Sequence, residues 1–213
     1  QEQLKKAKVL DMGAGGLGCA VLQYIATTGV VTSWIVDFDK VEIHNLHRQI
    51  LYTENQVGQA KATTAKLVLE NLNPLIDIIA FEEKLTAENA LRIIQNFDVV
   101  VDGCDNFATR YLVNDTCVTL GKTLVYGSIL KYEGQLAVFN YKGSKNLRDL
   151  FPEPPNPEDV PNCNLNGVMG TLPGIIGTMM AHETLKLLMD LPILKNELVL
   201  FNTLDWSFNK LKF

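Results

Sequence analysis

A glycine cluster near the start of the chain constrains its fold more than any other feature. Residues 13–18 (GAGGLG) follow a short apolar run at 8–12 and open a helical pattern at 17–28 that ends at Gly29. This G-x-G-x-x-G spacing between a strand and a helix lets backbone N–H groups approach a phosphate. Asp37 ends the next apolar run, where a carboxylate can bind both ribose hydroxyls. We predict a nucleotide site, which the cluster alone does not assign to NAD or ATP; the alternative is a turn that serves only helix–sheet packing. The loop glycines are Gly13, Gly15, Gly16 and Gly18.

Strand and helix patterns alternate as far as Ser128. Near-continuous apolar runs, such as VVV at 99–101, are typical of strands covered on both faces. The rhythm predicts an α/β fold with a Rossmann-like, doubly wound, mostly parallel sheet. Residues 133–141 then alternate, which predicts an antiparallel C-terminal extension. The predicted strands are 8–12, 33–37, 76–81, 98–102, 123–128, 133–141, 197–202 and 208–213, and the predicted helices are 17–28, 53–73, 86–96, 107–120 and 173–189.

Composition narrows the class of protein. With 47% hydrophobic residues the chain is not disordered, and its net charge of −5 argues against a general nucleic-acid binder. Its four cysteines are scattered, which predicts reduced thiols and a cytoplasmic location. The opening residues 1–8 are polar and basic, unlike a signal peptide. The longest uncharged stretch, 163–181, contains Pro173 and four glycines, so we expect a buried loop and helix start rather than a membrane span.

We expect the 213 residues to form a single domain. Its irregular part is a crossover segment at 142–166, which holds five of the eight prolines. Segments of that length within a compact domain are usually functional or disordered.

Polar side chains follow the predicted strands at the edge where an α/β sheet binds its ligands. Arg48 and Lys61 lie after the second strand, and Asp105 follows the strand at 98–102. Two cations facing a phosphate loop, with a carboxylate opposite, suit a triphosphate with Mg²⁺. The alternative is that Arg48 and Lys61 are ordinary solvated charges. The sequence therefore favours nucleotidyl or phosphoryl transfer.

At these residues the sequence resembles the MoeB/ThiF/HesA family, the bacterial relatives of ubiquitin-activating E1 enzymes. The resemblance implies that ATP·Mg²⁺ adenylates the C-terminal Gly-Gly carboxylate of a ubiquitin-fold sulfur-carrier protein (MoaD- or ThiS-like), releasing pyrophosphate. A homodimer is the family expectation, and the pathway is that of molybdopterin, thiamine or an amino acid. The matching segments are VLDMGAGGLGCAVLQYIATTGV, WIVDFDKVEIHNLHRQILY, VGQAKA, DGCDN, EGQLAVFNY and GVMGTLPGIIGTMMAHETLK.

The resemblance also implies roles for individual residues. The loop glycines would hold the nucleotide and Asp37 its ribose. Arg48 and Lys61 would offset phosphate charge in the transition state, and Asp105 would bind Mg²⁺. The remaining expected cofactor-binding residues are Asn45, Gln49 and Asn106.

The sequence departs from the family pattern in three places. Many members bind Zn²⁺ through two C-x-x-C pairs, but Asn146 and Asp149 stand where the first is expected, so we predict no zinc site. We expect no rhodanese domain and no separate catalytic-cysteine domain in these 213 residues. Cys163 lies where some members have a thiol that takes up the activated carrier; a loop cysteine without a role is the alternative. The family arginine that reaches the active site of the other subunit would lie ahead of Gln1.

Two other functions stay open at this point. An NAD(P)-dependent oxidoreductase would explain the glycine loop and Asp37, but not Arg48, Lys61 and Asp105. A catalytically silent E1-like binding partner is favoured weakly by the lack of the arginine ahead of Gln1. The presence of Arg48, Lys61 and Asp105 together argues against a catalytically silent protein.

Overall fold

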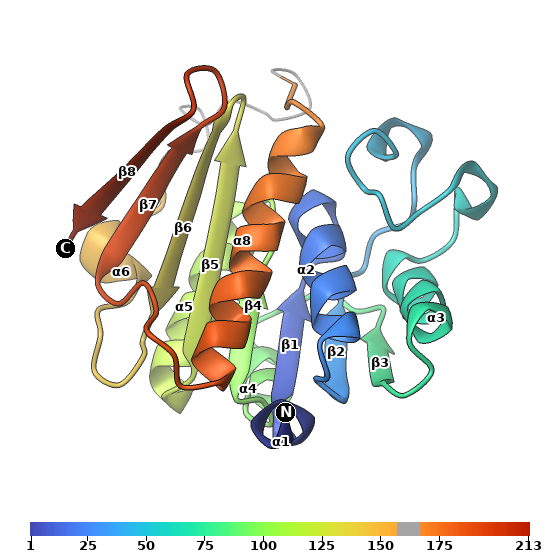
Figure 1. Cartoon of the computed structure of the whole chain (residues 1–213), viewed down its shortest axis with the longest axis horizontal. Helices are drawn as coiled ribbons and strands as arrows, with labels where there is room; N and C mark the ends of the chain where they lie inside the picture. Colours follow the sequence, from blue (N-terminus) through green and yellow to red (C-terminus); the bar gives the residue numbers. More distant parts are fainter. Residues whose placement is uncertain (157–166) are drawn as a thin grey trace.

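The computed structural model describes residues 1–156 and 167–213. Its centre is one eight-stranded sheet with the order β3-β2-β1-β4-β5-β6-β7-β8 (Figure 1). The strands from β3 to β5 pair in parallel, and those from β5 to β8 pair antiparallel. This confirms the predicted Rossmann-like sheet with an antiparallel extension. The strands are β1 (Lys8–Met12), β2 (Thr32–Val36), β3 (Asp77–Phe81), β4 (Val99–Asp102), β5 (Thr123–Leu130), β6 (Glu133–Phe139), β7 (Glu197–Asn202) and β8 (Ser207–Lys212).

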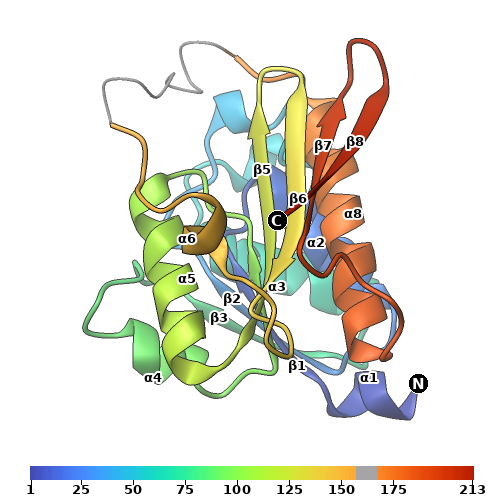
Figure 2. The same cartoon turned by 90° about the vertical axis from the view of Figure 1, so that its left-hand side faces the viewer.

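Helices cover both faces of the sheet, and Figure 2 shows these two helical layers on opposite sides of the strands. One face carries α2, α3 and α8, and the other carries α4, α5 and α6. Strand residues alternate between these layers: Val9 packs under α2 and α8, whereas Leu10 packs under α4 and α5. The helices are α1 (Glu2–Lys6), α2 (Gly16–Thr27), α3 (Lys61–Leu72), α4 (Ala90–Ile94), α5 (Phe107–Leu120), α6 (Leu147–Leu150) and α8 (Thr171–Leu188), with 3₁₀ turns η1 (Ile43–Asn45) and η2 (Glu54–Gln56).

Strand register brings the functional loops to one edge. Met12 of β1 pairs with Val36 of β2 on one side and with Asp102 of β4 on the other. The next residues therefore leave the sheet side by side, and the Gly103 N–H donates to the Met12 carbonyl at 2.9 Å. This edge lies where the strand order reverses, the usual ligand site of such sheets.

The structure corrects two predicted helices and adds two short ones. Residues 53–73 do not form one helix: η2 is capped by Thr53 and Gln56, Gly58 takes a φ of +88°, and α3 begins only at Lys61. The helix predicted at 86–96 shrinks to α4, because residues 86–89 form a turn in which the Thr86 N–H donates to Asn89 Oδ1 at 2.8 Å. The unpredicted helices are α1 and α6.

The long uncharged stretch is a core helix in its described part. Leu172, Ile176 and Met180 of α8 are buried against α2 and the sheet. Within the part of the chain that the structure describes, no helix is both long and apolar enough to span a bilayer.

The first part of the crossover segment contains α6, which starts with a capping box and is held to α5 by an ion pair. Asn146 and Asp149 form the capping box of α6, and Arg148 binds both carboxylate oxygens of Asp115 at 2.7 and 2.8 Å. Arg148 also donates to the Pro152 carbonyl at 2.8 Å. The residues that stand where the first zinc pair is expected therefore have a structural use. Residues 157–166 of the predicted crossover lie outside the described range.

A buried carboxyl group lies in the middle of the sheet. Asp11 of β1 is 1% exposed; Ser33 donates to its Oδ2 at 2.9 Å, and its Oδ1 has no hydrogen-bond partner among the described residues. Burial raises the pKa of Asp11 from 3.8 to about 7, although the Ser33 hydrogen bond opposes the rise. The folded chain thus keeps this proton over a pH range in which the unfolded chain has lost it.

Asp11→Asn should stabilise the protein at neutral and alkaline pH. Because the folded pKa lies above the unfolded one, this group lowers the free energy of unfolding as pH rises from about 4 to about 7. The neutral amide does not titrate, so the variant avoids this loss. We expect its free energy of unfolding to exceed that of wild type by on the order of 2–4 kcal/mol at pH 8 and to differ little at pH 4. Denaturant unfolding from pH 4 to 8 measures it. Asp115→Asn is the control of opposite sign, since Arg148 lowers the pKa of Asp115. Parallel pH profiles for wild type and Asp11→Asn would contradict the prediction.

Candidate active site

A cavity of about 1330 Å³ opens at the carboxyl ends of β1, β2 and β4. It is larger than most small-molecule pockets, so it has room for a nucleotide and part of a second reactant. Among the predicted site residues that the structure describes, only Gly18 does not line it, and Cys163 lies outside the described residues. The predicted residues on its wall are Gly13, Gly15, Gly16, Asp37, Asn45, Arg48, Gln49, Lys61, Asp105 and Asn106.

The glycine loop turns tightly from β1 into α2. A Cβ atom at Gly18 would lie 1.9 Å from the Gly13 carbonyl oxygen, so Gly18 allows the loop to close on itself. A Cβ at Gly15 would meet nothing nearer than Gln49 Nε2 at 3.7 Å. Gly15 is also the N-cap of α2 and supplies no side-chain acceptor. The first N–H groups of the helix are therefore suited to an anion in the cavity.

Asp37 fixes the loop from the end of β2. Its Oδ2 accepts the Ala14 N–H at 2.7 Å, and its Oδ1 accepts the Asp39 N–H at 2.8 Å. Burial raises the pKa of Asp37, while the Asp39 hydrogen bond and the Lys61 charge oppose that rise. Each carboxylate oxygen keeps further acceptor capacity toward the cavity.

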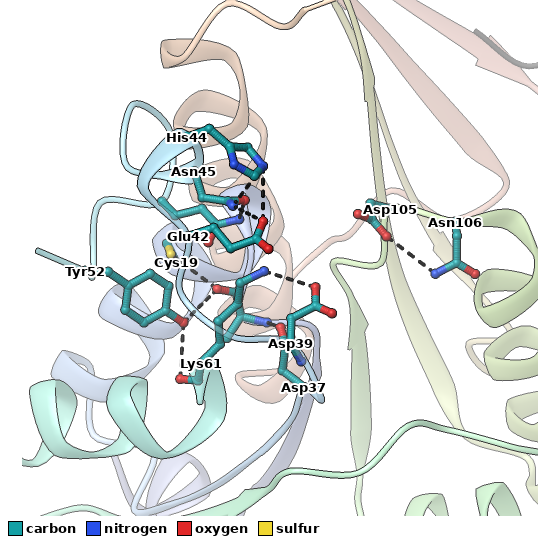
Figure 3. Close-up of polar contacts among 12 residues, drawn as sticks. Cys19, Asp37, Asp39, Glu42, His44, Asn45, Tyr52, Lys61, Asp105 and Asn106 are labelled. Atoms are coloured by element: carbon teal, nitrogen blue, oxygen red, sulfur yellow. Dashed lines mark hydrogen bonds and ion pairs between the residues drawn. The ribbon is translucent and has the colours of Figure 1, made fainter. Parts of the chain in front are cut away.

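Lys61 is buried at the first position of α3, next to the glycine loop. Its side chain is 6% exposed, and its Nζ lies 3.1 Å from Asp39 Oδ2 (Figure 3). A cation is unfavourable at a helix N-terminus, so Asp39 offsets the helix dipole as well as the loss of hydration. Asp39 was not among the predicted residues; its place two residues after Asp37 is the signal that could have found it.

Asn45 joins the polar side chains that follow η1. Its Oδ1 accepts Gln49 Nε2 at 2.8 Å and Arg48 Nη2 at 3.3 Å. Gln49 Oε1 is buried and has no hydrogen-bond partner in the described chain. Among residues 1–156 and 167–213, no carboxylate pairs with Arg48. A guanidinium on the cavity wall is thus available to an anionic ligand.

Asp105 and Asn106 lie apart from the Asp37, Asp39 and Lys61 cluster, beside α5 (Figure 3). Asp105 is exposed, and Asn106 Nδ2 donates to its Oδ1 at 3.4 Å. Asn106 Oδ1 accepts the Thr109 N–H at 2.9 Å, which makes Asn106 the N-cap of α5. The carboxylate of Asp105 therefore offers oxygen donors to the cavity that it lines.

Two further residues support the site, and sequence reasoning missed both. The buried Tyr52 hydroxyl lies 2.8 Å from the Ala14 carbonyl and 3.3 Å from the Lys61 carbonyl, so it joins the glycine loop to the start of α3. Arg110 of α5 reaches the cavity wall beneath Asp105. No local pattern predicts either contact, because the partners lie on other elements and loops of the fold.

The described cysteines do not resemble nucleophiles. Burial raises the pKa of Cys19 and of Cys117 to about 12 and that of Cys104 well above its usual value. Cys19 and Cys117 pack in the helix layers. Within residues 1–156 and 167–213, no group of three His, Cys, Asp or Glu side chains is arranged to hold a metal ion.

Comparison with known proteins assigns the chain to a family. The ThiF family model matches residues 1–213. The chain belongs to the ThiF family. It is 48% identical to a sulfur carrier protein adenylyltransferase of Thermus thermophilus, over 99% of this chain and 80% of that protein. It is 49% identical to the adenylyltransferase and sulfurtransferase MOCS3 of Anopheles gambiae, of whose length it spans only 48%.

A solved ThiF-like structure supports the fold. The crystal structure of E. coli MccB with ATP matches 99% of this chain and 64% of its own, with a TM-score of 0.86 and 20% identity. The recognised family and the Rossmann-like fold are therefore both confirmed.

Gly18→Ala should lower the stability of the protein, whereas Gly15→Ala should lower only its affinity for ATP. The added Cβ at Gly18 meets backbone, so we expect a loss of about 3 kcal/mol or more and a melting temperature at least about 6 °C lower. Gly15→Ala should keep the wild-type melting temperature but weaken ATP binding about tenfold, because its methyl group enters the space for phosphate. Thermal unfolding and calorimetry measure the pair. Equal melting temperatures for the two variants would refute this division.

Proposed function

We propose that this chain is an adenylyltransferase that uses ATP to activate the C-terminal Gly-Gly carboxylate of a ubiquitin-fold sulfur-carrier protein. The single observation that carries the proposal is the composition of the cavity wall. A phosphate-binding helix start and two cations lie on one side, with a carboxylate on the other. The relatives that are named as sulfur-carrier adenylyltransferases support the same activity.

The nucleotide would lie along the parallel half of the sheet. The glycine loop and the first turn of α2 would bind phosphate oxygens, and Asp37 would accept the ribose hydroxyls. Asn45 and Gln49 would bind the phosphates through their side-chain amides. Lys61 would exchange its partner Asp39 for a phosphate oxygen, and Arg48 would approach from the η1 side.

Mg²⁺ fits the donors on the Asp105 wall. Mg²⁺ in nucleotide sites is usually held by one or two carboxylates together with phosphate oxygens. The exposed carboxylate of Asp105, next to the Asn106 amide, would hold it, and the ion would neutralise phosphate charge. The Asn106 side chain already caps the N-terminus of α5, so it would support Asp105 rather than bind the ion directly.

The reaction needs charge neutralisation and alignment more than proton transfer. One oxygen of the carrier carboxylate attacks the α-phosphorus; the new O–P bond forms as the bond to the β-phosphate oxygen breaks, and pyrophosphate leaves. Both reactants are anionic, so Arg48 and Lys61 contribute by lowering the repulsion in the transition state. The carrier tail would enter through the part of the cavity formed by β5, β6 and residues 151–155.

The assembly and location belong to the same proposal. A cytoplasmic homodimer that acts in molybdopterin or thiamine biosynthesis is the arrangement that the family resemblance implies. Closed two-fold dimers are also the commonest assembly of soluble proteins. The thiol of Cys163 stays a candidate acceptor of the activated carrier.

Binding of ATP with and without Mg²⁺, and separately of NAD, tests the nucleotide assignment. Calorimetry should detect ATP binding that weakens when Mg²⁺ is omitted, and no binding of NAD. NAD binding by a chain that ignores ATP would replace this proposal with an oxidoreductase.

Asp105→Asn should reduce carrier-dependent pyrophosphate exchange at least about 100-fold, since it removes the carboxylate that would hold Mg²⁺ beside the transferring phosphates. The melting temperature should stay within about 2 °C of wild type, because the side chain is exposed. Glu88→Gln, an exposed carboxylate outside the cavity, is the matched control and should exchange normally. Normal exchange by Asp105→Asn would remove Asp105 from the site.

A further inference from the structure

A buried ion pair lies directly beneath the turn that carries Asp105. Asp102 ends β4 and is 0% exposed, and Arg110 of α5 is 5% exposed. Arg110 Nε lies 3.9 Å from Asp102 Oδ2, an oxygen that has no hydrogen-bond partner within the described residues. Burying two charges is costly, and Arg110 of this pair also lines the cavity, so the pair is a candidate for a functional role.

The Arg110 guanidinium donates hydrogen bonds to two backbone carbonyls. Nη2 donates to the Cys104 carbonyl at 2.5 Å, and Nη1 donates to the Gly127 carbonyl of β5 at 2.8 Å. The guanidinium also lies over the Tyr126 ring, 4.7 Å from its centre. Arg110 thus ties the turn after β4 to the neighbouring strand rather than pointing its charge at a ligand.

The two members of the pair bind the same residue of that turn. Asp102 Oδ1 accepts the Cys104 N–H at 2.9 Å, while Arg110 binds the Cys104 carbonyl. That carbonyl belongs to the peptide unit that joins Cys104 to Asp105. Its orientation sets the direction in which Asp105 leaves the backbone, because a peptide unit is rigid and planar.

We infer that Arg110, paired with Asp102, is a positioning residue that holds the Asp105 carboxylate toward the nucleotide phosphates. The inference rests on the proposed function. A planar fork that bridges two carbonyls is a property of arginine, and the ammonium of lysine does not reproduce it. Loss of the fork should therefore loosen Asp105 without removing any group that touches the nucleotide.

Arg110→Lys separates positioning from folding, because it keeps a positive charge beside Asp102. The measured quantity is the ratio of ATP affinities with and without Mg²⁺, determined by calorimetry on the full chain. We expect this ratio to fall about tenfold, with the Mg²⁺-free affinity and the melting temperature close to wild type. Arg92→Lys, at an exposed arginine of α4 that pairs with Glu83, is the matched control and should leave the ratio unchanged. If Arg110→Lys does not fold, the neutral double variant Asp102→Asn with Arg110→Gln takes its place, since it leaves no buried charge unpaired.

A double-mutant cycle with Asp105→Asn decides whether Arg110 acts through Asp105. A positioning role predicts that Arg110→Lys has no further effect on the ratio once Asp105 is replaced. The same loss in both backgrounds, or no loss in the wild-type background, would overturn the inference. A wild-type chain that bound ATP equally well with and without Mg²⁺ would instead overturn the proposed function, and the inference with it.

Discussion

The hydrogen bond from the Ala14 N–H to the Asp37 carboxylate, 2.7 Å long, is the contact on which the glycine-loop side of the cavity depends. It joins the end of β2 to the glycine loop between β1 and α2, and so fixes where α2 begins. The second oxygen of the same carboxylate fixes the backbone of Asp39, whose side chain in turn holds Lys61. One buried acid therefore sets the loop, the helix start and the buried cation at once.

The wall is charged before any ligand enters it. Lys61 is buried against Asp39, whereas Arg48 has no carboxylate partner among the described residues. A phosphate that enters must compete with Asp39 for Lys61 but not with any acid for Arg48. The cost of ordering the cations is met during folding, which is the preorganisation that electrostatic catalysis requires. An exposed Asp39, able to turn toward water when displaced, suits this exchange.

Sequence reasoning predicted what is local and missed what is not. The glycine loop, the parallel strands and α5 follow from spacing and apolar runs, and α5 matches its predicted bounds. The helix at 53–73 was wrong because the capping box of Thr53 and Gln56 is a true helix-start signal that Gly58 interrupts after a single turn. Tyr52 and Arg110 were missed because their partners lie on other elements, and only the folded sheet brings them together.

The two walls share one construction, which explains why acids cluster at this edge of the sheet. Asp37 follows the end of β2 and Asp102 is the last residue of β4, and both acids accept hydrogen bonds from backbone N–H groups of the adjoining loops. A second acid, Asp39 or Asp105, follows within three residues and faces the cavity. The first acid of each pair is buried and holds the loop backbone, and the second is exposed and accessible to a ligand. Because the inner acid is fixed by folding, replacing it should disturb the loop that it holds. The outer acids differ: Asp39 also offsets the charge of the buried Lys61, whereas the exposed Asp105 pairs with no cation among the described residues.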